Sequence, residues 1–182
     1  YDGGIWQQLY FGNLDGTETK VIFDSTKFDG YMKEFILAPD GNSVAMTLVD
    51  AAEGSPVEYL VRINTQTGNR TDLKQLMPFT STYLSDFSGD SKHVLIISSG
   101  MGDGVSNVYR ISIQDGTVSK VTNNTVSQDS AVFTPDPAAV YFSDSRDGRS
   151  ELYKIGAQGG NEIKLTTSGK FNGIIQMSGS LV

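Results

Sequence analysis

The sequence predicts an all-β protein, a β-propeller of four-stranded antiparallel blades with about four repeats in its 182 residues. Hydrophobic residues make up 38%, aromatic residues 10%, and 20 residues are Gly, a composition that suits many short strands joined by turns. A turn built around an aspartate recurs at Asp40, Asp90 and Asp136, at intervals of 50 and 46 residues. A similar succession of strand, loop and strand follows each turn, which indicates copies of one unit.

Each unit contains strands that can be placed in order. Runs rich in Val, Ile, Leu, Phe and Tyr follow the aspartate turns, at residues 43–49, 94–98 and 140–143. Third strands with alternating apolar and polar residues are expected at residues 58–63, 107–113 and 151–155. Each third strand leads into a turn whose glycine suits a tight hairpin, at residues 66–68, 114–116 and 158–160. A fourth strand closes the unit, most clearly at residues 119–122 and 163–166.

Both ends of the chain match parts of this unit. Gln8-Leu9-Tyr10 corresponds to the third strands at residues 107–109 and 151–153, and Asp15-Gly16 corresponds to the hairpin turn at Asp115-Gly116. Residues 171–182 repeat the first half of a unit. Residues 1–182 are therefore expected to form a single array of three full repeats and two half repeats, with about 45 residues per repeat.

Three questions about this array stay open at the level of sequence. A β-sandwich is the main structural rival, although it gives no reason for the same turns to recur at nearly constant spacing. The two half repeats could share one blade and close a ring, or the chain could be part of a larger propeller. Since an open array exposes the edges of its terminal blades, self-association of two chains through these edges is a third arrangement.

The last full repeat resembles a known family. It contains Phe133-Thr134-Pro135-Asp136, then residues 140–148, then Gly159-Gly160 and Lys164-Leu165-Thr166. This pattern resembles the WD-like repeats of the TolB C-terminal propeller, and the other repeats match it more loosely. The resemblance implies a propeller that binds other proteins in the bacterial envelope, hence a periplasmic or otherwise extracytoplasmic location. Similar blades also precede the catalytic domains of prolyl oligopeptidase-type hydrolases.

Charge and composition limit the classes of partner that this chain is expected to bind. The formal net charge is -7, from 21 acidic against 14 basic residues, so the average surface repels nucleic acid and anionic lipid. No apolar stretch approaches the roughly 18 to 20 residues that a membrane span requires, and membrane insertion is not expected. The chain has no Cys, which excludes thiolate metal sites and a cysteine nucleophile. We expect a protein or peptide partner and no cofactor.

The sequence offers no catalytic constellation, and we predict no catalytic residue and no metal ligand. The single histidine, His93, follows an aspartate turn, and the chain contains no Gly-x-Ser-x-Gly nucleophile motif. Asp40, Asp90 and Asp136 could in principle ring a Ca²⁺ ion. Hydrogen bonding within the turns is the favoured interpretation of these aspartates.

Weak candidates for a binding surface lie on loops. Asp144, Arg146, Asp147 and Arg149 gather in the loop after the second strand of the last full blade, although the same charges could neutralise one another in a solvated loop. Asp103 lies in a Gly-rich connection, and the sole tryptophan, Trp6, is a further aromatic candidate. Three tyrosines at equivalent repeat positions are expected in the core: Tyr10, Tyr109 and Tyr153.

These observations favour a non-enzymatic propeller scaffold that binds a protein or peptide, as a module of a bacterial envelope protein. The alternative is a propeller that gates or selects substrate for a peptidase or hydrolase whose catalytic domain lies elsewhere.

Overall fold

The computed structural model describes residues 7–27, 30–50, 56–76, 81–102 and 104–167. These residues form strands and turns, with one short 3-10 helix at Ser25–Lys27. The predicted half repeat at residues 171–182, together with Trp6 and Asp103, lies outside the described residues. The described part contains no helix of the length and apolarity that a membrane span requires.

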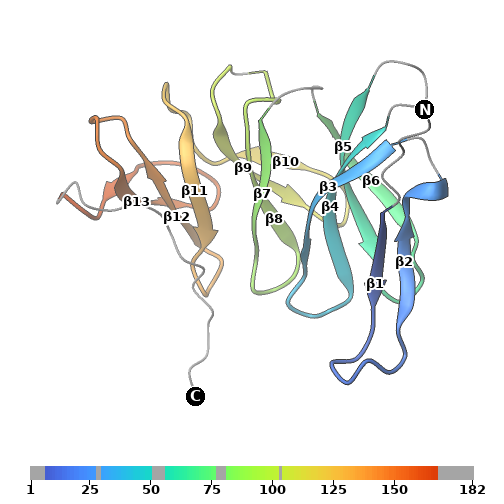
Figure 1. The fold of residues 1–182 in the computed structure, drawn as a ribbon. Coiled ribbons are helices and arrows are strands. Elements are labelled where there is room, and N and C mark those ends of the chain that lie inside the picture. The colour runs from blue at the N-terminus through green and yellow to red at the C-terminus, as the bar shows by residue number, and fades with distance from the viewer. Residues whose placement is uncertain (1–6, 28–29, 51–55, 77–80, 103, 168–182) are drawn as a thin grey trace.

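The strands form one two-stranded sheet and three four-stranded sheets, which follow one another along the chain (Figure 1). The two-stranded sheet comprises β1 (Gln8–Phe11) and β2 (Lys20–Asp24). The next sheet comprises β3 (Gly30–Leu37), β4 (Ser43–Asp50), β5 (Val57–Asn64) and β6 (Arg70–Leu76). The third comprises β7 (Thr82–Phe87), β8 (His93–Ser98), β9 (Asn107–Ser112) and β10 (Val118–Lys120). The fourth comprises β11 (Gln128–Phe133), β12 (Ala139–Asp144), β13 (Glu151–Gly156) and β14 (Ile163–Lys164).

Within each sheet, every strand pairs antiparallel with its neighbour in sequence, so every four-stranded sheet is a simple meander. The first strands of successive sheets contact one another, β3 with β7 and β7 with β11. Figure 1 shows the sheets side by side in chain order, with β1–β2 at one end of the row and β11–β14 at the other. The predicted all-β architecture of four-stranded antiparallel blades is confirmed, and β1–β2 corresponds to the outer half of a blade.

The hydrophobic core is divided into three layers, one between each pair of successive sheets. Ile22, Met46 and Ile63 belong to the layer between β1–β2 and β3–β6. A second layer joins β3–β6 to β7–β10, and a third joins β7–β10 to β11–β14. This succession excludes the sandwich, because a sandwich encloses one core between two sheets.

The expectation for the three equivalent tyrosines was right for two and wrong for one. Tyr109 and Tyr153 are buried because their rings face the preceding sheet. Tyr10 is 56% exposed. Its neighbours Leu9 and Phe11 pack toward β3–β6, so Tyr10 points to the opposite side, where the described residues place no sheet.

The fourth strands are shorter than predicted because threonine hydroxyl groups, instead of backbone carbonyls, accept the last hydrogen bonds from the third strands. Beyond β10, the Val108 N–H donates to the Thr122 hydroxyl at 2.9 Å instead of to a backbone carbonyl. The Leu152 N–H donates to the Thr166 hydroxyl in the same way, also at 2.9 Å. Each hydroxyl therefore satisfies an N–H group of the third strand after the regular ladder has ended.

The hairpin glycines hold successive blades together at their outer strands. Gly68, Gly116 and Gly159 all have positive φ angles, which glycine adopts without strain. A Cβ atom built on Gly116 would lie 2.2 Å from the backbone oxygen of Leu73 on β6 of the preceding sheet. The approach is looser at the other two turns, where a Cβ atom would lie 3.5 Å from the Ile22 oxygen at Gly68 and 3.3 Å from the Val121 oxygen at Gly159. At Gly116, glycine is required both by the turn and by the close approach of the neighbouring sheet.

We expect Gly116→Ala to be far more destabilising than Gly16→Ala. Both residues have positive φ, at 73° and 81°, so each substitution costs about 1–2 kcal/mol of backbone strain. Only at Gly116 does the added methyl group also collide with a neighbouring sheet, at an additional cost of about 1–3 kcal/mol; no atom lies within 4 Å of a Cβ at Gly16. Urea unfolding measures both values, and equal losses for the two variants would show that the sheets do not approach this closely.

Candidate functional site

The charged loop after β12 folds back on its own blade. Asp144 is 0% exposed and accepts bonds of 2.9 Å from the Arg146 Nε to both of its carboxylate oxygens. Arg146 also donates from Nη1 to Glu162 at 2.6 Å, and its guanidinium lies over the Tyr153 ring at 4.3 Å from the centroid. These bonds raise the pKa of Arg146 above its ordinary value. Asp144 and Arg146 therefore bind the loop after β12 to other residues of the same blade and stabilise that blade.

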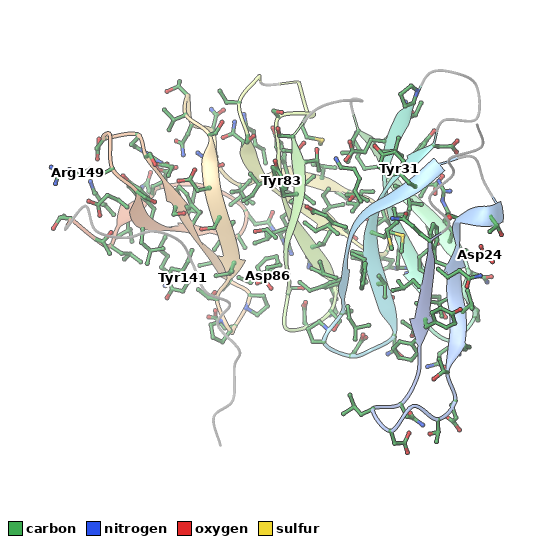
Figure 2. The ribbon with its side chains drawn as sticks, viewed as in Figure 1. Asp24, Tyr31, Tyr83, Asp86, Tyr141 and Arg149 are labelled. Carbon is green, nitrogen blue, oxygen red and sulfur yellow. The ribbon has the colours of Figure 1, made fainter. Side chains whose placement is uncertain are left out.

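The other two residues of the loop reach the surface. Asp147 is exposed and pairs with Lys164 at 2.7 Å, and this hydrogen bond lowers the pKa of the Asp147 carboxyl. Arg149 is exposed and points away from the sheets at the outer end of the array (Figure 2). The structure thus brings Asp144 and Arg146 together with Glu162, and separates Arg149 from them. Glu162 and Lys164 were missed by the sequence analysis, because both lie beyond the next hairpin.

We expect Arg146→Met to lower the free energy of unfolding by about 3–5 kcal/mol, because it leaves the buried Asp144 carboxylate without its partner. Lys164→Met, which breaks the exposed pair with Asp147, is the matched control and should cost no more than about 1 kcal/mol. Thermal and urea unfolding of both variants measure this difference. A loss of under 1 kcal/mol in the free energy of unfolding for Arg146→Met would refute the stabilising role of the Asp144–Arg146 pair.

The three turn aspartates are occupied by local hydrogen bonds. Asp40 accepts from the Asn42 N–H at 2.9 Å. Asp90 accepts from the Ser88 hydroxyl at 2.6 Å, and Asp136 from the Thr134 hydroxyl at 2.7 Å. These hydroxyl bonds lower the pKa of both Asp90 and Asp136. Among the described residues, no three His, Cys, Asp or Glu side chains are placed to hold a metal ion.

His93 lies at the start of β8 and is half-buried. Its Nδ1 atom lies 3.1 Å from the Arg110 guanidinium. Burial is the largest cause of the lowered pKa of His93, and the charge of Arg110 lowers it further. The Arg110 side chain on the neighbouring strand β9 therefore fixes the position of the ring, an arrangement that gives His93 a structural role.

A different set of polar side chains joins the first strands of neighbouring sheets. Glu34 on β3 accepts a hydrogen bond from the Leu84 N–H on β7 at 2.8 Å. Asp86 on β7 accepts from the Phe133 N–H on β11, also at 2.8 Å. Ser85 bonds the backbone of Ala131 in both directions. These side chains satisfy backbone groups at the inner edges of β7 and β11, which no neighbouring strand pairs.

An open groove with a volume of about 830 Å³ crosses these first strands. Its lining includes apolar side chains such as Leu37 and Tyr83, and three carboxylates, those of Glu34, Asp86 and Asp129. Figure 2 shows Tyr83 and Asp86 on β7, with Asp86 near the lower end of β11. Tyr83 is 54% exposed, which makes it a large apolar side chain available to a partner.

Sequence reasoning missed the acidic residues of the groove for a physical reason. Each first strand carries a register shift, at Lys33 in β3, Ser85 in β7 and Asp129 in β11. Since a bulge changes which side chain points to which face, the three carboxylates do not occupy equivalent repeat positions. A repeat pattern alone therefore gives no signal for them.

Asp86 is the groove carboxylate most affected by its surroundings. Burial raises its pKa above the ordinary value of 3.8, and the N–H bonds from Phe133 and Phe87 oppose this effect. The folded state consequently binds a proton at a higher pH than the unfolded chain does. Folding thus gains stability as the pH falls from neutral through the folded pKa, and the gain is complete below 3.8.

We expect Asp86→Asn to benefit the fold more at pH 7 than at pH 4. The asparagine oxygen can still accept the Phe133 N–H bond, while the cost of a buried charge disappears. The difference in melting temperature between the variant and the wild type should therefore shift in favour of the variant as the pH rises. A pH-independent difference, measured by thermal scans between pH 4 and pH 7, would contradict the raised pKa.

Successive four-stranded meanders, joined at their first strands and packed through layered cores, define this chain as a set of β-propeller blades. A model of the TolB beta propeller domain matches residues 6–180, and the chain belongs to this family.

Known proteins share the fold at low sequence identity. TolB from Acinetobacter baumannii is 24% identical, with a TM-score of 0.63 over 91% of this chain and 39% of that chain. A prolyl endopeptidase structure is 13% identical, with a TM-score of 0.65 over 88% of this chain and 26% of that chain. The uncharacterised protein Atu1656 of Agrobacterium fabrum is 26% identical over 69 residues, which are 38% of this chain and 24% of that protein. The chain thus matches well under half the length of each.

Proposed function

We propose that this chain is a non-enzymatic propeller module that binds a protein or peptide, as part of a bacterial envelope protein outside the cytoplasm. The observation that carries the proposal is the groove across β3, β7 and β11, because it is large enough for several side chains of a partner. Membership of the TolB propeller family supports both the binding role and the extracytoplasmic location.

The groove offers the features of a peptide-binding surface. Tyr83 is a rigid aromatic side chain that covers apolar area at a small entropic cost. Leu37 and Pro39 add apolar area on the β3 side, and Ser106 and Gln128 add polar groups on the opposite side. The floor is rigid, since side-chain bonds join β3 to β7 and β7 to β11. A rigid surface keeps the entropic cost of binding low.

We expect Tyr83→Ala to weaken peptide binding by about 10-fold or more, as the loss of an aromatic anchor does. The assay selects binders from a phage-displayed random peptide library and measures their affinity by fluorescence anisotropy. Tyr10→Ala is the matched control, because Tyr10 is 56% exposed and lies on β1, away from the groove.

A second variant tests the loop proposed from sequence. Asp147→Ala combined with Arg149→Ala removes the two exposed charges of the loop without disturbing the Asp144–Arg146 pair. Loss of binding only in this variant would move the site to the loop. Failure of the library to yield any binder, or affinities that change in none of the variants, would overturn the proposal.

The alternative function is substrate selection for a peptidase or hydrolase domain. It is favoured by the similarity in fold to the propeller-containing prolyl endopeptidase structure, with a TM-score of 0.65. The intact mass and sequence of the natural polypeptide distinguish the two functions. A catalytic domain in the same polypeptide supports substrate selection, and a polypeptide without one supports the binding module.

A further inference from the structure

The ionisable groups that line the groove are of one sign. Glu34, Asp86 and Asp129 are acidic, and the described residues of the lining include no Lys, Arg or His. None of the three forms an ion pair with a basic residue in the part of the chain that the structure describes. Glu34 and Asp86 accept backbone N–H bonds, which hold the carboxylates in place without neutralising their charge.

Asp129 differs from the other two carboxylates. It is exposed, and within the described part of the chain it accepts only a long bond of 3.3 Å from the Ser145 hydroxyl. Asp129 is also the extra residue at the register shift of β11, so its side chain is not part of the regular alternation of the strand. It is therefore the carboxylate most able to turn toward an occupant of the groove.

Poor solvation strengthens the effect of the excess negative charge in the groove lining. Asp86 lies deep enough in the structure for burial to raise its pKa, so its charge is poorly solvated. A cation bound beside any of these three carboxylates would lie in surroundings less polar than bulk water, where attraction between charges is stronger. An anionic partner would meet repulsion from the same three groups.

We infer that the groove selects a peptide segment that carries a positive charge next to an apolar residue, with Asp129 as the specificity-determining residue. The apolar residue packs on the apolar part of the lining, to which Tyr83 belongs, and the ammonium or guanidinium group is attracted by the carboxylates of the lining, of which Asp129 is exposed. This inference rests on the proposed function, since it names the chemistry of the partner that the groove takes. The net charge of -7 adds long-range attraction for such a segment.

The test uses three fluorescent peptides that differ at one central residue: lysine, norleucine or glutamate, between leucines, with both ends blocked. We expect the lysine peptide to bind about 10-fold more tightly than the norleucine peptide, and the glutamate peptide to bind most weakly. Raising the salt concentration should reduce the preference for lysine and leave the norleucine affinity nearly unchanged.

Asp129→Asn should reduce the preference for lysine by about 3-fold or more, while the norleucine affinity stays the same. Asp15→Asn is the matched control, because it removes the same charge from the exposed β1–β2 hairpin and should leave the preference intact. Equal effects of the two substitutions would mean that only net charge matters, which overturns the role of Asp129.

The two proposals fail in different ways. If the three peptides bind equally and Tyr83→Ala weakens all of them, the groove binds peptides but charge selection is wrong. If no peptide binds, or Tyr83→Ala changes none of the affinities, the proposed function itself is wrong.

Discussion

The arrangement of this protein depends on how the inner edge of each blade is satisfied. The first strand of a blade has no strand beyond it, so its backbone N–H groups need other acceptors. The preceding blade supplies them from side chains, as Glu34 does for Leu84 and Asp86 for Phe133. Each such bond fixes the distance and register between two neighbouring blades. The hairpin glycines add a second constraint at the outer strands, where Gly116 meets the backbone of Leu73.

Most of the architecture could be predicted because each unit repeats local chemistry. Aspartate turns, β-branched runs and hairpin glycines depend on residues close in sequence, and the structure has the second and third strands within about two residues of their expected bounds. The errors arise where distant residues decide. Tyr10 matches Tyr109 in sequence, yet its burial depends on whether another sheet covers it. The end of β10 depends on the hydroxyl of Thr122, which replaces a backbone acceptor.

The candidate site was harder to predict, for a reason visible in two sets of charges. Asp144 and Arg146 are close in sequence, and their proximity allows them to neutralise each other inside the blade. A dense charged motif can therefore indicate a stabilised loop as readily as a binding surface. The groove carboxylates are far apart in sequence, on β3, β7 and β11, and the bulges place them at different repeat positions. Only the packing of three sheets places them in the lining of one groove.

The carboxylates that hold the blades together also determine the charge of the groove. Replacing Glu34 or Asp86 by an apolar residue would remove an acceptor from the next blade and so lower the stability of the fold. Asp129 lacks this constraint, because among the described residues it accepts just the long bond from Ser145 and serves no backbone group of another blade. At Glu34 and Asp86 a substitution must keep a hydrogen-bond acceptor for the next blade, whereas at Asp129 it need not. Specificity is most easily altered at such a position, since a change there leaves the joined strands intact.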